Sequence, residues 1–289
     1  MDITKYLDTW AAAYRNDLIE NIMPFWMKFG LDRKHGGIYT CLDRDGKLMD
    51  STKSVWFQGR FGFIASYAYN HIEKKQEWLA ASKSCIDFIE THCTDIDGHL
   101  FFEVTEEGIP LRKRRYVFSE CFAAIAMSEY AIASGDKSYA TKALEMFKRI
   151  LKFLSTPGFL EPKYLPTLQS RGHSITMILI NTASRIREVI EDPVLDRQIN
   201  ESLTSIRQYF MHPEFKALLE MVGPKGELID TCNGRTINPG HCIETSWFIM
   251  EEARHKNWDK DLVQLALQIL DWSWEWGWDK EYGGIINFR

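Results

Sequence analysis

The sequence predicts an all-α fold built from helical hairpins that close into an α/α toroid, with short β-hairpin loops gathered at one mouth. Three observations support this prediction. Helical periodicity dominates the 289 residues, loops rich in glycine and aspartate interrupt it, and polar residues recur near the starts of alternate helices. No linker rich in serine, glycine or proline divides the chain, so residues 1–289 are expected to form a single domain.

Apolar residues at helical spacing predict nine helices along the chain. The first carries an apolar stripe at four-residue intervals, made of Tyr6, Trp10, Tyr14, Leu18 and Ile22. The other eight are expected over residues 52–71, 75–93, 114–134, 136–154, 168–190, 194–210, 239–255 and 259–276. Such helices bury their apolar faces only by stacking on their neighbours.

The loops between these helices contain an internal repeat. Residues 30–38 and 277–285 share the pattern G-[LW]-D-x-x-x-G-G-I, and the stretches 95–108 and 222–238 resemble further copies. Turn residues followed by alternating apolar residues are typical of a short β-hairpin. Stacked units of this kind form either an open solenoid or a closed toroid. We favour the toroid, because it would bring one set of polar residues to a single cavity: Arg60, Glu120, His173 and His241.

Composition excludes several classes of protein. The chain has 35 basic and 40 acidic residues, a net charge of −5, which disfavours binding to nucleic acid. The N-terminus lacks the apolar run of a signal peptide, and the most apolar window, residues 121–133, is too short to span a membrane. The six cysteines form no C-x-x-C pair and are expected to be reduced thiols. We therefore expect a cytoplasmic protein that does not contact membranes.

The segment NPGHCIETSWF, residues 238–248, carries the strongest chemical signal. Asn238 is a suitable N-cap, and a proline follows it at the first helical position. His241 then lies in the first turn, where the helix dipole favours the neutral imidazole of a general base. Glu244 and Trp247 follow on the same helix face. The alternative is a surface histidine beside a capping glutamate. No H-E-x-x-H set is present, so neither a metal ion nor another cofactor is expected.

Five further side chains are candidates for a binding site, each with a structural alternative. Arg60 lies among phenylalanines and could bind a ligand or form an ion pair. Trp56 could stack on a sugar ring or belong to the core. His173 and Glu120 stand near the starts of predicted inner helices, where either role suits them. Arg235, just before the His241 helix, could bind an anion or a hydroxyl group.

The motifs resemble those of the N-acylglucosamine 2-epimerase family, which includes the renin-binding proteins and, more distantly, the cellobiose 2-epimerases. The resemblance rests on WFQGR at 56–60, FSECFAAIAMSEYA at 118–131, GRTINPGHCIETSWF at 234–248 and GWDKEYGGI at 277–285. It implies an (α/α)6 barrel that interconverts N-acetylglucosamine and N-acetylmannosamine. This reaction removes the C2 proton of the open-chain sugar and returns it to the opposite face. The resemblance leaves open a nucleotide modulator and a homodimer.

The resemblance also implies roles for individual residues. His241 would be one acid/base group, with Glu244 orienting it, Trp247 forming a wall of the pocket and Arg60 near the reacting oxygens. The family's second catalytic histidine has no counterpart in this sequence, and family members have more barrel helices than the nine predicted here. We therefore expect a chain that lacks the C-terminal helices and has little epimerase activity, unless His173 serves the opposite face of the sugar.

Three kinds of function follow from these observations. A sugar 2-epimerase, or an aldose–ketose isomerase of the same superfamily, would exchange substrate protons with solvent. A non-catalytic module would bind carbohydrate or protein without exchange. A glycoside hydrolase, which α/α toroids also host, would need two carboxylates across the pocket, and Glu120 and Glu244 are the candidates for them.

Overall fold

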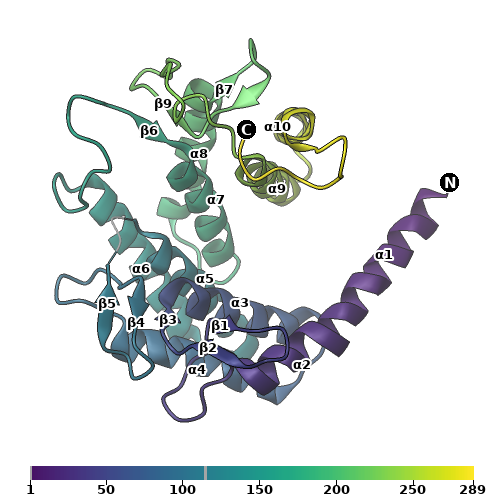
Figure 1. The fold of residues 1–289 in the computed structure, drawn as a ribbon, viewed down its shortest axis with the longest axis vertical. Coiled ribbons are helices and arrows are strands. Elements are labelled where there is room, and N and C mark those ends of the chain that lie inside the picture. The colour runs from purple at the N-terminus through teal and green to yellow at the C-terminus, as the bar shows by residue number, and fades with distance from the viewer. Residues whose placement is uncertain (1, 114–115) are drawn as a thin grey trace. The chain divides into compact units, whose positions relative to one another are not determined.

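A computed structural model describes residues 2–113 and 116–289 of the protein (Figure 1). The chain divides into two compact units, Met1–Glu161 and Pro162–Arg289. The single domain expected over residues 1–289 stays a prediction. Among the described residues, no helix combines the length and apolar character that crossing a membrane requires.

The first unit is built from antiparallel helix pairs. Its helices are α1 (Ile3–Asp17), α2 (Met23–Phe25), α3 (Val55–His71), α4 (Gln76–His92), α5 (Phe118–Ser134) and α6 (Lys137–Ser155). Two π-helical turns, η1 (Leu18–Ile22) and η2 (Trp26–Gly30), extend the first helix. α3 packs against α4 and α5, and α5 packs against α6. The helices predicted in this unit are confirmed. α5 begins at Phe118 instead of the predicted residue 114, and positions 114–115 lie outside the described residues.

Short strands close the loops of the first unit. β1 (Cys41–Leu42) pairs with β2 (Leu48–Asp50), and β3 (Lys53–Ser54), β4 (Glu103–Val104) and β5 (Pro110–Arg112) form a sheet in that order. The third helix begins at Val55 instead of the predicted residue 52, because β3 is paired with β4. The N–H of Val55 extends this pairing by donating to the carbonyl oxygen of Phe102 at 2.9 Å.

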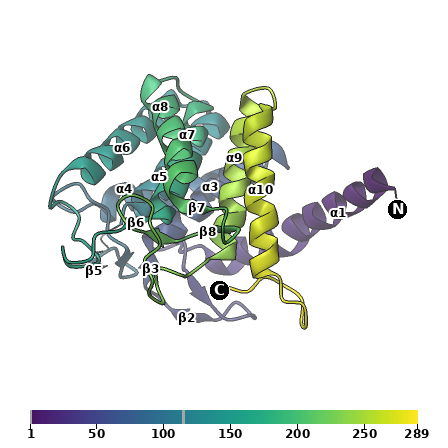
Figure 2. The same cartoon turned by 90° about the horizontal axis from the view of Figure 1, so that it is seen from above.

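The second unit repeats the same design. Its helices are α7 (His173–Arg187), α8 (Pro193–Ser205) with η3 (Ile206–Phe210), α9 (Pro239–His255) and α10 (Lys260–Gly277). Its strand pairs are β6 (Arg171–Gly172) with β9 (Met221–Val222), and β7 (Met211–His212) with β8 (Ala217–Leu218). Figure 2 shows α9 and α10 side by side. The helix predicted from residue 168 begins at His173, because residues 171–172 form β6.

The repeated loop sequence folds in the same way in both units. The N–H of Asp32 donates to the carbonyl oxygen of Gly37 at 3.1 Å, and that of Asp279 donates to Gly284 at 2.9 Å. Each aspartate carboxylate accepts hydrogen bonds from the N–H groups two and three residues further on. Both glycines of each copy have positive φ, which only glycine adopts without strain. The stretches 95–108 and 222–238 contain a tighter turn instead, in which the N–H of Asp95 donates to the His99 carbonyl oxygen and that of Gly223 donates to the Glu227 carbonyl oxygen.

The close approach of α3 and α5 depends on a glycine. A Cβ atom at Gly59 would lie 2.6 Å from the backbone carbonyl carbon of Phe122 and 2.8 Å from its oxygen. The neighbouring Gln58 is fully buried and bonds the backbone N–H and carbonyl of Ile38 at 2.8 and 2.7 Å. Much of the WFQGR motif therefore packs α3 against its neighbours.

We expect Gly59→Ala to lower the free energy of unfolding by about 1–3 kcal/mol, because α3 and α5 must separate to admit the methyl group. Gly172→Ala is the matched control, since a Cβ there would meet nothing within 4 Å. It should stay within about 1 kcal/mol of the wild type. Denaturant unfolding measures both variants, and equal stabilities would contradict this account of the helix contact.

Candidate active site

Strand pairing places a histidine and a glutamate side by side in the second unit. Gly172 pairs with Met221, so His173 and Glu220 are the next residues along the two strands. The N–H of His173 donates to the carbonyl oxygen of Glu220 at 3.0 Å, and the N–H of Glu220 donates to that of Thr236 at 3.3 Å. The Glu220 backbone is thereby held from both sides.

Helix α9 brings His241 to the same carboxylate. Asn238 caps the helix as predicted, and its side chain accepts a hydrogen bond from the His241 N–H at 3.1 Å. His241 Nδ1 lies 2.9 Å from Glu220 Oε1, and the His241 side chain is 36% exposed. With Nδ1 bonded to Glu220, Nε2 is the ring nitrogen left for a substrate.

His173 lies on the other side of Glu220 and is fully buried. Its Nδ1 is 3.5 Å from Glu220 Oε1, and its Nε2 is 3.1 Å from Thr245 Oγ1. The Thr245 hydroxyl also donates to the carbonyl oxygen of His241 at 2.8 Å. The expectation that His173 opens into a cavity is therefore wrong. Its ring is buried between Glu220 and Thr245.

The Glu220 carboxylate governs ionisation at this site. Burial acts to raise the pKa of Glu220, but the contacts with His173 and His241 lower it to about 2. The hydrogen bond that His241 Nδ1–H donates to Glu220 raises the pKa of His241, and the charges of Glu220 and Glu244 add to this effect. The helix dipole was expected to lower the pKa of His241 and favour its neutral form, and this expectation is wrong. A carboxylate in direct contact outweighs the partial charge of a helix end.

Glu244 and Trp247 lie on the predicted face of α9 but do not hold the His241 ring. Glu244 is exposed, and Trp247 is 52% exposed with its ring 5.1 Å from that of Phe248. The carboxylate that contacts His241 is Glu220, which sequence reasoning missed. Glu220 stands 21 residues from His241 in a segment without a motif, and only the pairing of β6 with β9 reveals its position.

Arg235 occupies an exposed loop before α9. It forms an ion pair with Asp230, and the two side chains are 57% and 81% exposed. Exposed pairs of this kind are weak and open readily. Arg235 is therefore accessible to an anion or a hydroxyl group, as its prediction requires.

The first unit carries Arg60 beside an aromatic patch. The Arg60 guanidinium lies 4.2 Å from the ring centre of Phe122, 5.7 Å from Phe57 and 6.0 Å from Trp56. Trp56 is partly buried, and its ring centre is 5.1 Å from that of Phe102. The Trp56 indole Nε1 is buried without a hydrogen-bond partner. Flat rings with a cation above them suit the binding of a polar ring.

Glu120 is fully buried and holds a loop in place. Its Oε1 accepts a hydrogen bond from the Leu100 N–H at 2.6 Å and contacts His99 Nδ1. Gln58 holds the first loop of this unit in a comparable way. The prediction that Glu120 faces a cavity is therefore wrong. Its carboxylate is buried and accepts a hydrogen bond from the backbone N–H of Leu100, in the loop between α4 and α5.

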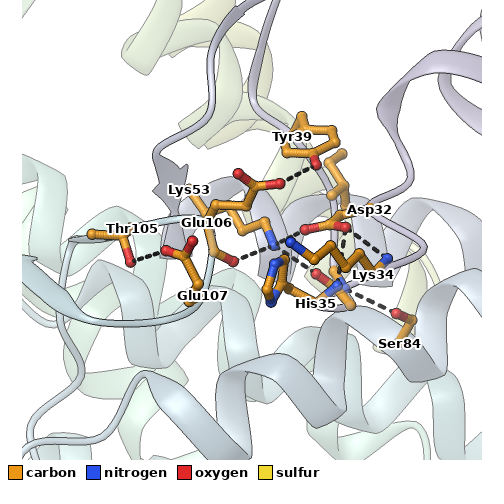
Figure 3. Close-up of polar contacts among 12 residues, drawn as sticks. Asp32, Lys34, His35, Tyr39, Lys53, Ser84, Thr105, Glu106 and Glu107 are labelled. Carbon is orange, nitrogen blue, oxygen red and sulfur yellow. Dashed lines mark hydrogen bonds and ion pairs between the residues drawn. The ribbon is translucent and has the colours of Figure 1, made fainter.

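A buried lysine ties the two loops of the first unit together (Figure 3). Lys53 Nζ donates to Asp32 Oδ2 at 2.6 Å and to the carbonyl oxygens of Gly36 and Glu106, each at 2.8 Å. The Tyr39 hydroxyl donates to the Glu106 carboxylate at 2.6 Å. Lys53 lies two residues before the first residue of α3, so this cluster fixes the start of the helix that carries the aromatic patch.

Comparison with known proteins decides the family. Residues 37–288 match the family model described as N-acylglucosamine 2-epimerase (GlcNAc 2-epimerase). The chain belongs to the N-acylglucosamine 2-epimerase family. This confirms the resemblance seen in the motifs and the predicted enzyme class, carbohydrate epimerase or isomerase.

Individual members of the N-acylglucosamine 2-epimerase family and their neighbours extend this result. The N-acylglucosamine 2-epimerase of Rattus norvegicus is 29% identical over 291 residues, which cover 98% of this chain and 69% of that protein. A cellobiose 2-epimerase of Ruminococcus albus is 31% identical over 143 residues, 49% of this chain and 36% of that protein. The structure of cellobiose 2-epimerase from Bacillus thermoamylovorans B4167 matches with a TM-score of 0.85 at 21% identity, covering 97% of this chain and 76% of that one. The predicted fold class, helical hairpins of the (α/α)6 barrel type, is thereby confirmed.

Proposed function

We propose that the protein has the chemistry of a sugar 2-epimerase acting on N-acetylglucosamine or N-acetylmannosamine, with His241 as the acid/base group that removes and returns the C2 proton on one face. The observation that carries this proposal is the contact between Glu220 and His241 Nδ1, 2.9 Å long. It leaves Nε2 for the substrate and makes the imidazole a stronger base. The choice of an N-acetylated sugar rests on the rat relative, which matches 98% of this chain.

In the proposed reaction, His241 Nε2 takes the proton from C2 of the open-chain sugar. The imidazolium that forms is stabilised by Glu220 through Nδ1–H. Negative charge develops on the enediolate oxygen, where a cation or a hydrogen-bond donor would stabilise it. Trp247 would provide a flat surface for the sugar, and Arg235 would bind an outer hydroxyl group.

Return of the proton to the opposite face needs a second acid/base group. His173 was the candidate for this step, but its ring is fully buried and in contact with Glu220. His241 alone supports exchange on one face, in which a solvent proton returns to the side from which the substrate proton left. Proton exchange at C2 is therefore the most direct signature of this site.

The other functions receive less support from the described residues. A glycoside hydrolase would need Glu120 as one of its two carboxylates, and that side chain is fully buried against His99 and Leu100. A binding module would leave the basic character of His241 without a use. The cytoplasmic location, the nucleotide modulator and the homodimer stay predictions.

A panel of sugars in heavy water tests the substrate. We expect deuterium to enter C2 of N-acetylmannosamine faster than C2 of cellobiose or mannose, as followed by proton NMR. Faster exchange of cellobiose or mannose would assign the site to another sugar of the same reaction class. Sugar binding with no exchange of any of them would contradict the epimerase proposal and favour a binding module.

A further inference from the structure

We infer that Glu220 is a positioning residue for His241, and that the buried His173 holds Glu220 in place, so that the three side chains act as one unit. The predicted effect on exchange rests on the proposed function. The predicted effect on the titration of His241 does not, because it follows from the contacts alone.

The Glu220 carboxylate presents one oxygen to both imidazole rings. Oε1 lies 2.9 Å from His241 Nδ1 and 3.5 Å from His173 Nδ1. An ionised carboxylate only accepts hydrogen bonds, so it selects the form of His241 that carries a proton on Nδ1. Accepting this proton fixes both the tautomer and the direction of the ring, with Nε2 turned away from Glu220.

His173 joins α9 to the Glu220 backbone through two hydrogen bonds, one at its Nε2 and one at its N–H. The single hydrogen of the Thr245 hydroxyl goes to the carbonyl oxygen of His241, so the hydroxyl oxygen accepts from His173 Nε2. His173 Nδ1 lies 3.5 Å from Glu220 Oε1, which is a close contact but not a hydrogen bond. The His173 N–H also donates to the Glu220 carbonyl at 3.0 Å. His173 therefore contacts Glu220 through both backbone and side chain.

Few other ionisable groups act on this unit. Among the described residues, the titratable groups near His241 are Glu220 before β9, His173 on α7, and Glu244 and Cys242 on α9. Cys242 is buried, its thiol bonds the Leu218 carbonyl, and burial raises its pKa so that it stays neutral. From α10, the uncharged Ser273 faces Cys242. Glu244 is exposed to solvent, so Glu220 is the charge in contact with His241.

Glu220→Gln tests the inference, because the amide keeps the shape and can still accept from Nδ1 but removes the charge. We expect the pKa of His241 to fall, as read by NMR titration of histidine-labelled protein with His241→Asn used for assignment. The acid limb of the pH–rate profile for C2 exchange should move to lower pH, since a less basic imidazole stays deprotonated at lower pH. Exchange at its plateau should fall about 10- to 100-fold, because the ring is less well oriented.

The matched control is Glu214→Gln. Glu214 also contacts a histidine Nδ1, that of His212 at 3.0 Å, but its own side chain is 58% exposed. This control should leave the titration of His241 and the exchange rate unchanged. An unchanged His241 titration in Glu220→Gln would overturn the inference. A lowered pKa in a protein that never exchanges C2 protons would uphold the inference and reject the proposed function.

His173→Asn provides a second variant, which keeps the inference testable if Glu220→Gln does not fold. It removes one of the two groups that hold the pKa of Glu220 at about 2, so the titration of that carboxyl should move up. Carbon NMR of labelled glutamate measures this shift. Exchange should also slow while circular dichroism stays that of the folded protein. A carboxyl titration that stays in place would show that His173 does not hold Glu220.

Discussion

Replacement of His241 by asparagine is expected to slow proton exchange at C2 of the sugar by about 10²-fold or more. Asparagine keeps much of the volume and can still donate a hydrogen bond to Glu220, but it cannot take up a proton near neutral pH. The backbone N–H that bonds the Asn238 cap is unaffected, so α9 should form as before. The initial rate of deuterium uptake measures the loss, and thermal unfolding checks the fold.

His255→Asn is the control for this variant. His255 is exposed at the other end of the same helix, so its replacement should leave exchange at the wild-type rate. An exchange rate for His241→Asn within a few-fold of the wild type would show that another group removes the proton. Equal losses in both variants would point to a general effect on the helix.

Replacement of Lys53 by methionine is expected to destabilise the protein by about 3–5 kcal/mol. Methionine keeps the volume but leaves the Asp32 carboxylate without its cation, and two carbonyl oxygens without a donor. The Lys53 and Asp32 side chains are 0% and 1% exposed, so water does not replace the lost contacts. The denaturant midpoint should fall while the slope of the transition is retained.

Lys83→Met isolates the effect of burial. Lys83 contacts Asp87 at 2.6 Å, the same distance as the pair of Lys53 with Asp32, but these side chains are 38% and 50% exposed. Solvated pairs of this kind contribute about 0–1 kcal/mol, so this variant should unfold close to the wild type. Similar losses in the two variants would contradict the role given to the buried pair.

Helix positions could be predicted because their signals are local. Apolar spacing marks each helix, and α9 begins at Pro239 as predicted because the Asn238 cap and the proline are adjacent in sequence. The starts of α3 and α7 were predicted too early. The residues just before them pair with strands far away in the sequence, and no local pattern shows such a contact.

The candidate site was predictable only in part, for a related reason. His241 stands in a motif with capping signals, whereas Glu220 and Lys53 acquire their partners from strand pairing and loop contacts. Glu120 and His173 were found near the starts of inner helices, but that position has two uses. A polar side chain there can face a cavity or be buried against its neighbours. Glu120 is buried and accepts from the Leu100 N–H of a loop, and His173 is buried with its Nε2 beside Thr245 of α9.

The most direct test of the central claim is the release of deuterium from N-acetylmannosamine labelled at C2, followed in ordinary water. Release requires only that a base removes the label, whichever face receives the new proton. We expect the wild type and His255→Asn to release deuterium to solvent, and His241→Asn to release it about 10²-fold more slowly or not at all. Retention of the label by the wild type with sugar bound, or equally fast release by His241→Asn, would contradict the claim that His241 removes the C2 proton.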